Sequence, residues 1–178
     1  MIQFIDTYLT GTLCYAKGDT AMQSSKKTAT GGLIAALYVV LTYLAELLGL
    51  ASGAIQVRFS ESLTLLPCLT PTAIPGLTVG CLLANFMTGC APWDVVFGTM
   101  ATLFGAIGTY ALRRKPYLLW LPPVISNTLI VPIILINVYG VEEFWPLIAL
   151  QIFVGEMISC CFLGTIVLRF VRKHYLLS

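Results

Sequence analysis

Apolar runs recur along this chain at about the length of a membrane-spanning helix, which takes about 20 mostly apolar residues. Five such runs are clear, at about 29–49, 72–91, 95–112, 117–139 and 144–168. A further stretch at 54–70 is shorter and carries Arg58 and Glu61 before Pro67. Hydropathy by itself therefore predicts five spans and leaves this sixth stretch undecided.

The distribution of basic residues favours counting the stretch at 54–70 as a span. Lys and Arg collect in the cytoplasmic loops of membrane proteins. With six spans, all three basic clusters fall on one side, whereas five spans would place two of the clusters outside. The clusters are Lys17 with Lys26 and Lys27, Arg113 with Arg114 and Lys115, and Arg169 with Arg172 and Lys173.

We therefore predict an all-α integral membrane protein with six transmembrane helices and both termini in the cytoplasm. The loops that face outward in this topology contain Asp94, Glu142 and Glu143 and no Lys or Arg, which agrees with the assignment although it was not used to make it. The expected location is the plasma membrane.

Composition supports the same class of protein. Of the 178 residues, 58% are hydrophobic and 10% are charged, which is too little charge for the surface of a soluble domain. A net charge of +2 gives no indication of nucleic-acid binding. The six cysteines lie mostly in apolar surroundings with no CxxC pair, and we expect them to be small buried residues.

The chain divides into three predicted parts. Residues 1–27 form an N-terminal cytoplasmic or leader segment, residues 28–172 a six-helix membrane domain, and residues 173–178 a C-terminal tail. The first 21 residues are too polar for a span and lack the apolar core of a signal peptide. A leader and a helix lying on the membrane surface are both open for them.

Polar residues inside the predicted spans lie in the outer half of the membrane, between its midplane and its outer surface. Ionisable residues in spans are costly and usually line a cavity or a functional path, although single Asn residues often serve only to bond helices together. Arg58 and Glu61, three positions apart on a helix, could also form a purely structural pair. Together these residues predict a pocket open to the outside. The candidate substrate-binding residues are Gln56, Arg58, Glu61, Asn85, Asn127 and Glu156.

Carboxylates and carboxamides in one pocket indicate a ligand rich in N–H donors, because a carboxylate accepts two parallel hydrogen bonds. We expect no catalytic residues, metal ion or cofactor. The only histidine, His174, lies in the basic tail, and the sequence has no GxxxxGK[ST] loop for ATP and no GxSxG or HExxH motif. Uphill transport would therefore require an ion gradient or an energised partner.

Small residues recur four positions apart near the start of the first span, in the sequence "TGGLIAALYVVL" at 30–41. Such a face allows another helix to approach closely. The approaching helix belongs either to a partner protein or to this chain itself. The residues are Gly31, Gly32, Ala35 and Ala36.

The stretch "IQVRFSESLTLLPCLTPTAIPGLTVGCLLAN" at 55–85 closely resembles the signature of the QueT family. These proteins are substrate-binding S components of energy-coupling factor (ECF) transporters and are associated with queuosine precursors. "LIAALYVVLTYL" (33–44), "RRKPYLLWLPPVISNTLIV" (113–131) and "GEMISCCFLG" (155–164) are also similar to that family, so the resemblance extends over about residues 28–172.

The resemblance implies a six-helix subunit that captures its substrate from outside, with an ECF transmembrane coupling subunit and two ABC ATPase subunits as partners. It implies that the small residues of the first helix contact the coupling subunit and that the polar residues bind a 7-deazaguanine. Glu61 and Glu156 could accept its paired N–H groups and an aminomethyl cation, in either order. The alternatives are an S component for another small heterocyclic vitamin and a stand-alone, ion-coupled permease.

Overall fold

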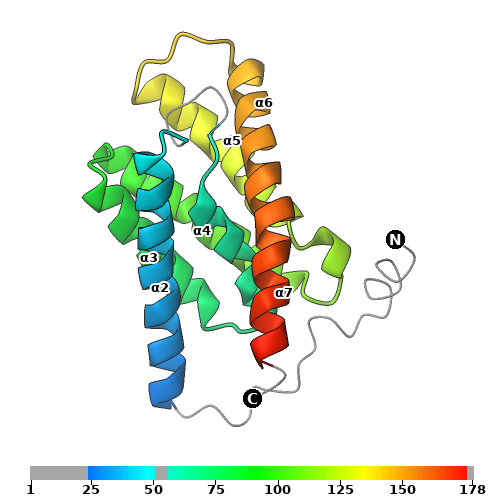
Figure 1. Cartoon of the computed structure of the whole chain (residues 1–178). Coiled ribbons are helices and arrows are strands. Elements are labelled where there is room, and N and C mark those ends of the chain that lie inside the picture. Colours follow the sequence, from blue (N-terminus) through cyan, green and yellow to red (C-terminus); the bar gives the residue numbers. More distant parts are fainter. Residues whose placement is uncertain (1–23, 51–55, 176–178) are drawn as a thin grey trace.

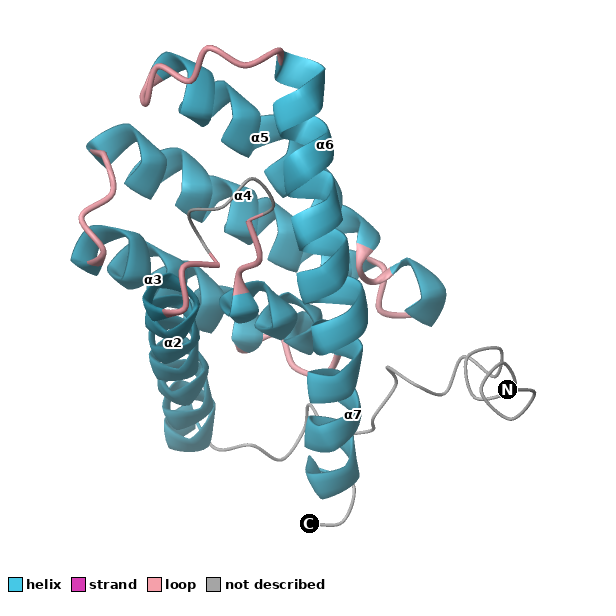
Figure 2. Ribbon diagram, turned by 45° about the horizontal axis from the view of Figure 1, so that its top comes forward, coloured by secondary structure: helices cyan, strands magenta, loops and turns pink. Residues whose placement is uncertain are grey.

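The computed structural model describes residues 24–50 and 56–175, and the regular elements in this part of the chain are all helices, joined by loops and turns (Figures 1 and 2). Elements carry the labels of Figure 1. In chain order they are α2 (Ser24–Leu47), the 3₁₀ helix η1 (Phe59–Cys68), α3 (Ala73–Met87), α4 (Pro92–Ala111), the short 3₁₀ helix η2 (Pro116–Leu118), α5 (Leu121–Asn137), α6 (Trp145–Glu156), the π-helix η3 (Met157–Leu163) and α7 (Gly164–Tyr175).

Three helical stretches are long and apolar enough to cross a bilayer: Lys26–Leu47, Pro116–Asn137 and Trp145–Lys173. They agree with the runs predicted at 29–49, 117–139 and 144–168. The apolar helix Ala73–Met87 is shorter. Large apolar side chains cover the outside of the bundle, as lipid contact requires; Leu33 is 62% exposed and Phe86 74%. The helical membrane class is confirmed, and the count of six spans stays a prediction.

The stretch predicted as the second span is not a spanning α-helix. Its described part forms η1, ten residues long, and a 3₁₀ helix rises about 2 Å per residue, so η1 measures about 20 Å against the ~30 Å of a bilayer core. Side chains explain the tight winding, because Ser62 and Thr64 each donate to the carbonyl three residues earlier, at 2.6 Å. Residues 54 and 55 lie outside the described part.

Instead of facing lipid, η1 lies inside the bundle. Every residue from Ser60 to Cys68 is buried, and η1 contacts α2, α3, α4, η3 and α7. Its location places the polar sequence around Glu61 at the centre of the protein, where other elements can reach it from several sides.

Helices α2 and α3 pack closely through small residues on both sides. A Cβ added to Gly76 of α3 would lie 2.7 Å from the carbonyl oxygen of Gly31, and one added to Gly80 would lie 3.0 Å from the Ala35 backbone. Such short distances leave no room for side chains. Gly31 and Ala35 therefore serve packing within this chain, which was the alternative left open for the small-residue face.

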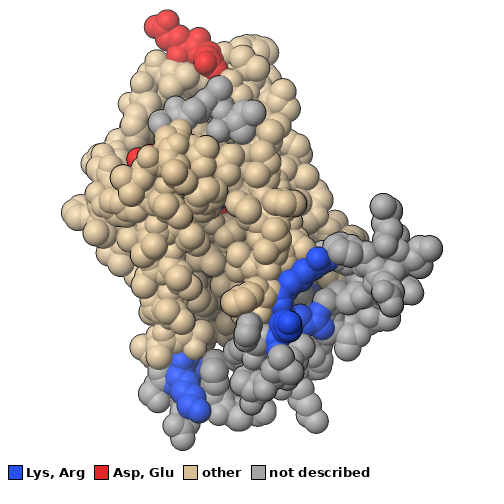
Figure 3. All heavy atoms as spheres, in the orientation of Figure 1, with Lys and Arg blue, Asp and Glu red and all other residues tan. Residues whose placement is uncertain are grey.

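Charge is segregated along the long axis of the molecule. Figure 3 shows Lys and Arg side chains at the lower end and a group of acidic side chains at the opposite end. The start of α2 and the end of α7 both lie at the lower end (Figure 1). This arrangement is the one that six passes predict, and the positive-inside rule would place the basic end in the cytoplasm.

A labelling experiment tests this orientation. In intact cells, a membrane-impermeant maleimide is expected to leave Arg114→Cys unmodified and to modify Glu142→Cys. Both positions are exposed, but Arg114 belongs to a basic cluster that is predicted to be cytoplasmic, whereas Glu142 belongs to an acidic loop that is predicted to face outward. Permeabilised cells should label both variants, and the unsubstituted protein gives the background from its own cysteines. Labelling of Arg114→Cys from outside would invalidate the proposed orientation.

Candidate substrate-binding site

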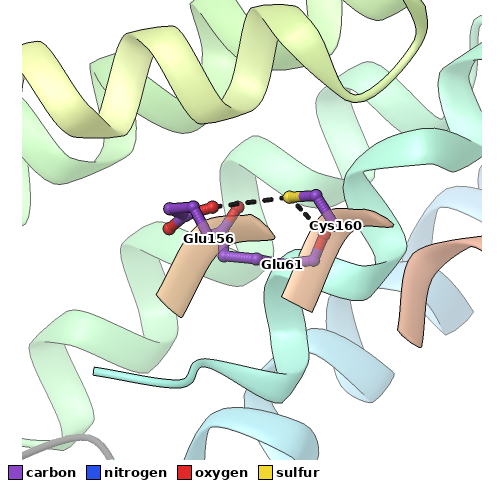
Figure 4. A group of neighbouring side chains, drawn as sticks. All are labelled: Glu61, Glu156 and Cys160. Carbon is purple, nitrogen blue, oxygen red and sulfur yellow. Dashed lines mark hydrogen bonds between the residues drawn. The ribbon is translucent and has the colours of Figure 1, made fainter. Parts of the chain in front are cut away.

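Two carboxylates and a thiol meet in the interior of the bundle (Figure 4). Glu61 comes from η1, Glu156 from the last position of α6, and Cys160 from η3 one turn later. One oxygen of each carboxylate and the Cys160 sulfur lie within 4.8 Å of one another. The exposed fractions of Glu61, Glu156 and Cys160 are 1%, 5% and 0%. The predicted pairing of Glu61 with Glu156 in one site therefore has a structural basis.

The type of helix changes between Glu156 and Cys160. The chain winds as an α-helix up to Glu156 and then as a π-helix from Met157 to Leu163, a form that occurs frequently at functional sites. Just before the change, Gly155 permits a very close approach. A Cβ at Gly155 would overlap the carbonyl oxygen of Gln56, so only glycine lets the chain leading into η1 lie against α6.

Both oxygens of Glu156 have protein partners. The Asn127 side-chain amide of α5 donates to Oε1 at 2.9 Å. The Cys160 thiol donates to Oε2 at 3.4 Å. These bonds fix the orientation of the carboxylate, and each oxygen keeps a second lone pair for a ligand.

Glu61 is bonded on one side only. The Tyr38 hydroxyl of α2 donates to Oε1 at 2.6 Å, whereas Oε2 is buried and has no hydrogen-bond partner in the described part of the chain. The structural pair with Arg58 considered above is not formed within the part of the chain that the structure describes. Arg58 has an extended backbone (φ −103°, ψ 107°) just before η1, so the two residues do not share a helical face.

Arg58 and Asn85 line a small pocket that lies beside this acidic group. Tyr38 and Ser60 also line it, so the Tyr38 side chain borders both places. The volume of this pocket is about 20 Å³, enough for roughly one water molecule. The buried Ser60 hydroxyl has no hydrogen-bond partner among residues 24–50 and 56–175. Five of the six predicted residues thus divide into an acidic group with Glu61, Glu156 and Asn127 and a pocket lined by Arg58 and Asn85 together with Glu46. The sixth, Gln56, contacts Gly155 through its backbone.

Sequence reasoning missed two residues of the acidic group, Tyr38 and Cys160. Cys160 had a usable signal, since it lies four residues after Glu156 and so occupies the same face of a helix. Tyr38 offered only a hydroxyl in an apolar run. Glu61, Glu156 and Cys160 are also residue types that bind Zn²⁺.

Two of the four small residues predicted to contact a partner protein are exposed on α2. Gly31 and Ala35 face α3, while Gly32 and Ala36 are exposed, and a Cβ added at Gly32 would meet nothing within 4 Å. An exposed pair of small residues on an apolar helix leaves space for another helix at that position.

Comparison with known proteins gives the family of this chain. The family model described as QueT transporter matches residues 28–173. The queuosine precursor transporter QueT of Lactococcus lactis subsp. cremoris (strain MG1363) is 37% identical over 87 residues, which are 48% of this chain and 50% of that protein. The match thus spans about half the length of the curated relative. No solved structure matches the chain.

The family consists of transporters rather than enzymes, and its apolar helices place it in the plasma membrane as a multi-pass protein. The family match covers all the described helices from the first turns of α2 to Lys173 of α7, and it includes every predicted site residue. The chain belongs to the QueT transporter family.

Proposed function

We propose that this protein is the substrate-binding S component of an ECF-type importer and that it captures a queuosine precursor of the 7-deazaguanine type from outside the cell. The observation that carries this proposal is the buried group of carboxylate acceptors formed by Glu61 and Glu156. Asn127 orients one of them through a hydrogen bond of 2.9 Å.

The chemistry of a 7-deazaguanine is complementary to this group. Its ring N–H and exocyclic amine lie side by side, and one carboxylate can accept both. The relative from Lactococcus is a queuosine precursor transporter, which supports the same substrate class. Asn85 and Arg58 in the neighbouring pocket offer donors for a ring carbonyl.

The proposal includes partners because the chain has no means of its own to use ATP. The sequence lacks a phosphate-binding loop of the GxxxxGK[ST] type. We propose that an ECF transmembrane coupling subunit docks on the α2 face around Gly32 and Ala36 and connects the protein to two ABC ATPase subunits. The exposure of both residues supports this role.

Co-purification tests the assembly. When the tagged protein is expressed with its host's coupling subunit and ATPases, all of them are expected to elute together, and ATP-dependent uptake of the precursor should require the ATPases. An ATPase variant that cannot hydrolyse ATP serves as the control. Uptake that persists without the ATPases would contradict the proposal and favour a stand-alone, ion-coupled permease.

A further inference from the structure

The two buried carboxylates differ in what they still offer to a ligand. Both oxygens of Glu156 accept bonds from the protein, one from Asn127 and one from Cys160. Glu61 accepts a bond from Tyr38 at one oxygen, and its other oxygen, Oε2, is buried with no hydrogen-bond partner among the residues that the structure describes. A buried acceptor without a donor is costly and rare, which indicates that something outside the protein supplies the donor.

Charge points to the nature of that donor. Glu61 and Glu156 each bring an acidic group into the interior, and the side chains that bond to them are neutral: a tyrosine, an amide and a thiol. Arg58, the basic residue next to η1, lines the neighbouring pocket, and its positive charge acts on both carboxylates from there. One arginine does not balance two ionised carboxylates, and buried charges are tolerated when a counter-charge is in hydrogen-bonding contact, so the site can accept a second cation.

The spacing suits an amine nitrogen. Charge-assisted N–H···O bonds are about 2.7–2.9 Å long. One oxygen of Glu61 and one of Glu156 lie within 4.8 Å of each other, so a nitrogen bonded to Glu61 is also close to the negative charge of Glu156. An ammonium group has three N–H donors and brings a second positive charge to the pair of carboxylates.

We propose that Glu61 Oε2 accepts the bond from a positively charged amine of the transported molecule, and that Glu156 accepts its uncharged, paired N–H groups. This assignment rests on the proposed function and refines it, because it makes Glu61 the residue that selects a cationic substrate over a neutral one. Tyr38 is the positioning residue, since its hydroxyl holds the opposite oxygen of Glu61.

Two ligands of equal size test the assignment. Purified wild-type protein is titrated calorimetrically with 7-aminomethyl-7-deazaguanine and with its neutral 7-hydroxymethyl analogue. The wild type is expected to bind the amine about tenfold or more tightly, as bonds to charged groups contribute more than neutral ones. In Glu61→Gln this preference should fall towards one, with binding of the hydroxymethyl analogue largely retained. In Glu156→Gln both affinities should fall together and the preference should remain.

The outcomes separate this inference from the proposed function. Equal binding of both ligands by the wild type, or a preference that survives in Glu61→Gln, overturns the role of Glu61 while leaving a 7-deazaguanine transporter in place. Failure of the wild type to bind either ligand overturns both. If Glu61→Gln does not fold, Glu156→Gln still tests the assignment, because a preference that is lost in Glu156→Gln would assign the amine to Glu156 and overturn the role of Glu61.

Discussion

Replacing Gly32 or Ala36 with leucine is expected to abolish uptake while substrate binding to the isolated subunit stays close to the wild-type value. Both positions are exposed on α2, and a Cβ at Gly32 has nothing within 4 Å, so the larger side chain finds space in the monomer. It would, however, separate α2 from a docking helix, because close helix approach depends on small residues. Uptake into cells and ligand titration of the purified subunit give the two measurements.

Two further substitutions act as controls for this prediction. Ala111→Leu also enlarges an exposed alanine, at the end of α4, and should leave both uptake and binding intact. Ala35→Leu enlarges a residue packed against Gly80 of α3 and should impair folding, since overpacking a tight contact costs about 1–3 kcal/mol. If Gly32→Leu reduced binding as much as it reduced uptake, the exposed face would not be a coupling surface.

Glu156→Gln is expected to weaken substrate binding by roughly tenfold or more. The substitution keeps the size of the side chain but turns one acceptor oxygen into a donor, which would then face a donor of the ligand. A buried polar group left unsatisfied costs about 1–3 kcal/mol, equivalent to roughly tenfold or more in affinity. The fold should persist, because a glutamine is easier to bury than an ionised glutamate and the remaining oxygen can still accept from Asn127.

Calorimetric titration of the purified variant measures this loss, and its elution in size-exclusion chromatography reports on folding. Glu142→Gln removes an acidic charge from an exposed position outside the helices and is expected to bind substrate as the wild type does. Affinity equal to that of the wild type in Glu156→Gln, or a variant that does not fold, would assign Glu156 a structural role instead.

The helical membrane architecture could be predicted from the sequence because it depends on quantities that are local in the chain. A run of about 20 apolar residues is long enough for the bilayer wherever it occurs, and the predicted runs at 29–49, 117–139 and 144–168 coincide with the long apolar helices. The gathering of basic residues at one end likewise follows from the order of the clusters along the chain.

Prediction from the sequence was weakest where local signals conflict. The stretch 54–70 is apolar enough to suggest a span, yet Ser62 and Thr64 bond to the backbone three residues back and its described part winds into a buried 3₁₀ helix. Hydropathy measures how apolar a segment is and does not distinguish contact with lipid from contact with other helices. The segment is apolar because the rest of the protein surrounds it.

The sequence by itself determined the class of protein, the separation of basic from acidic residues between its two ends, and the residue types available for binding. Only the tertiary structure decided which of those residues meet. It brought Tyr38 to Glu61 across 23 positions of the chain and Asn127 to Glu156 across 29, left one oxygen of Glu61 without a partner, and turned Gly31 and Ala35 towards α3 but Gly32 and Ala36 outward. The physical reason is that hydrogen bonds and close packing depend on distances between elements that are remote in sequence, and no local pattern contains those distances.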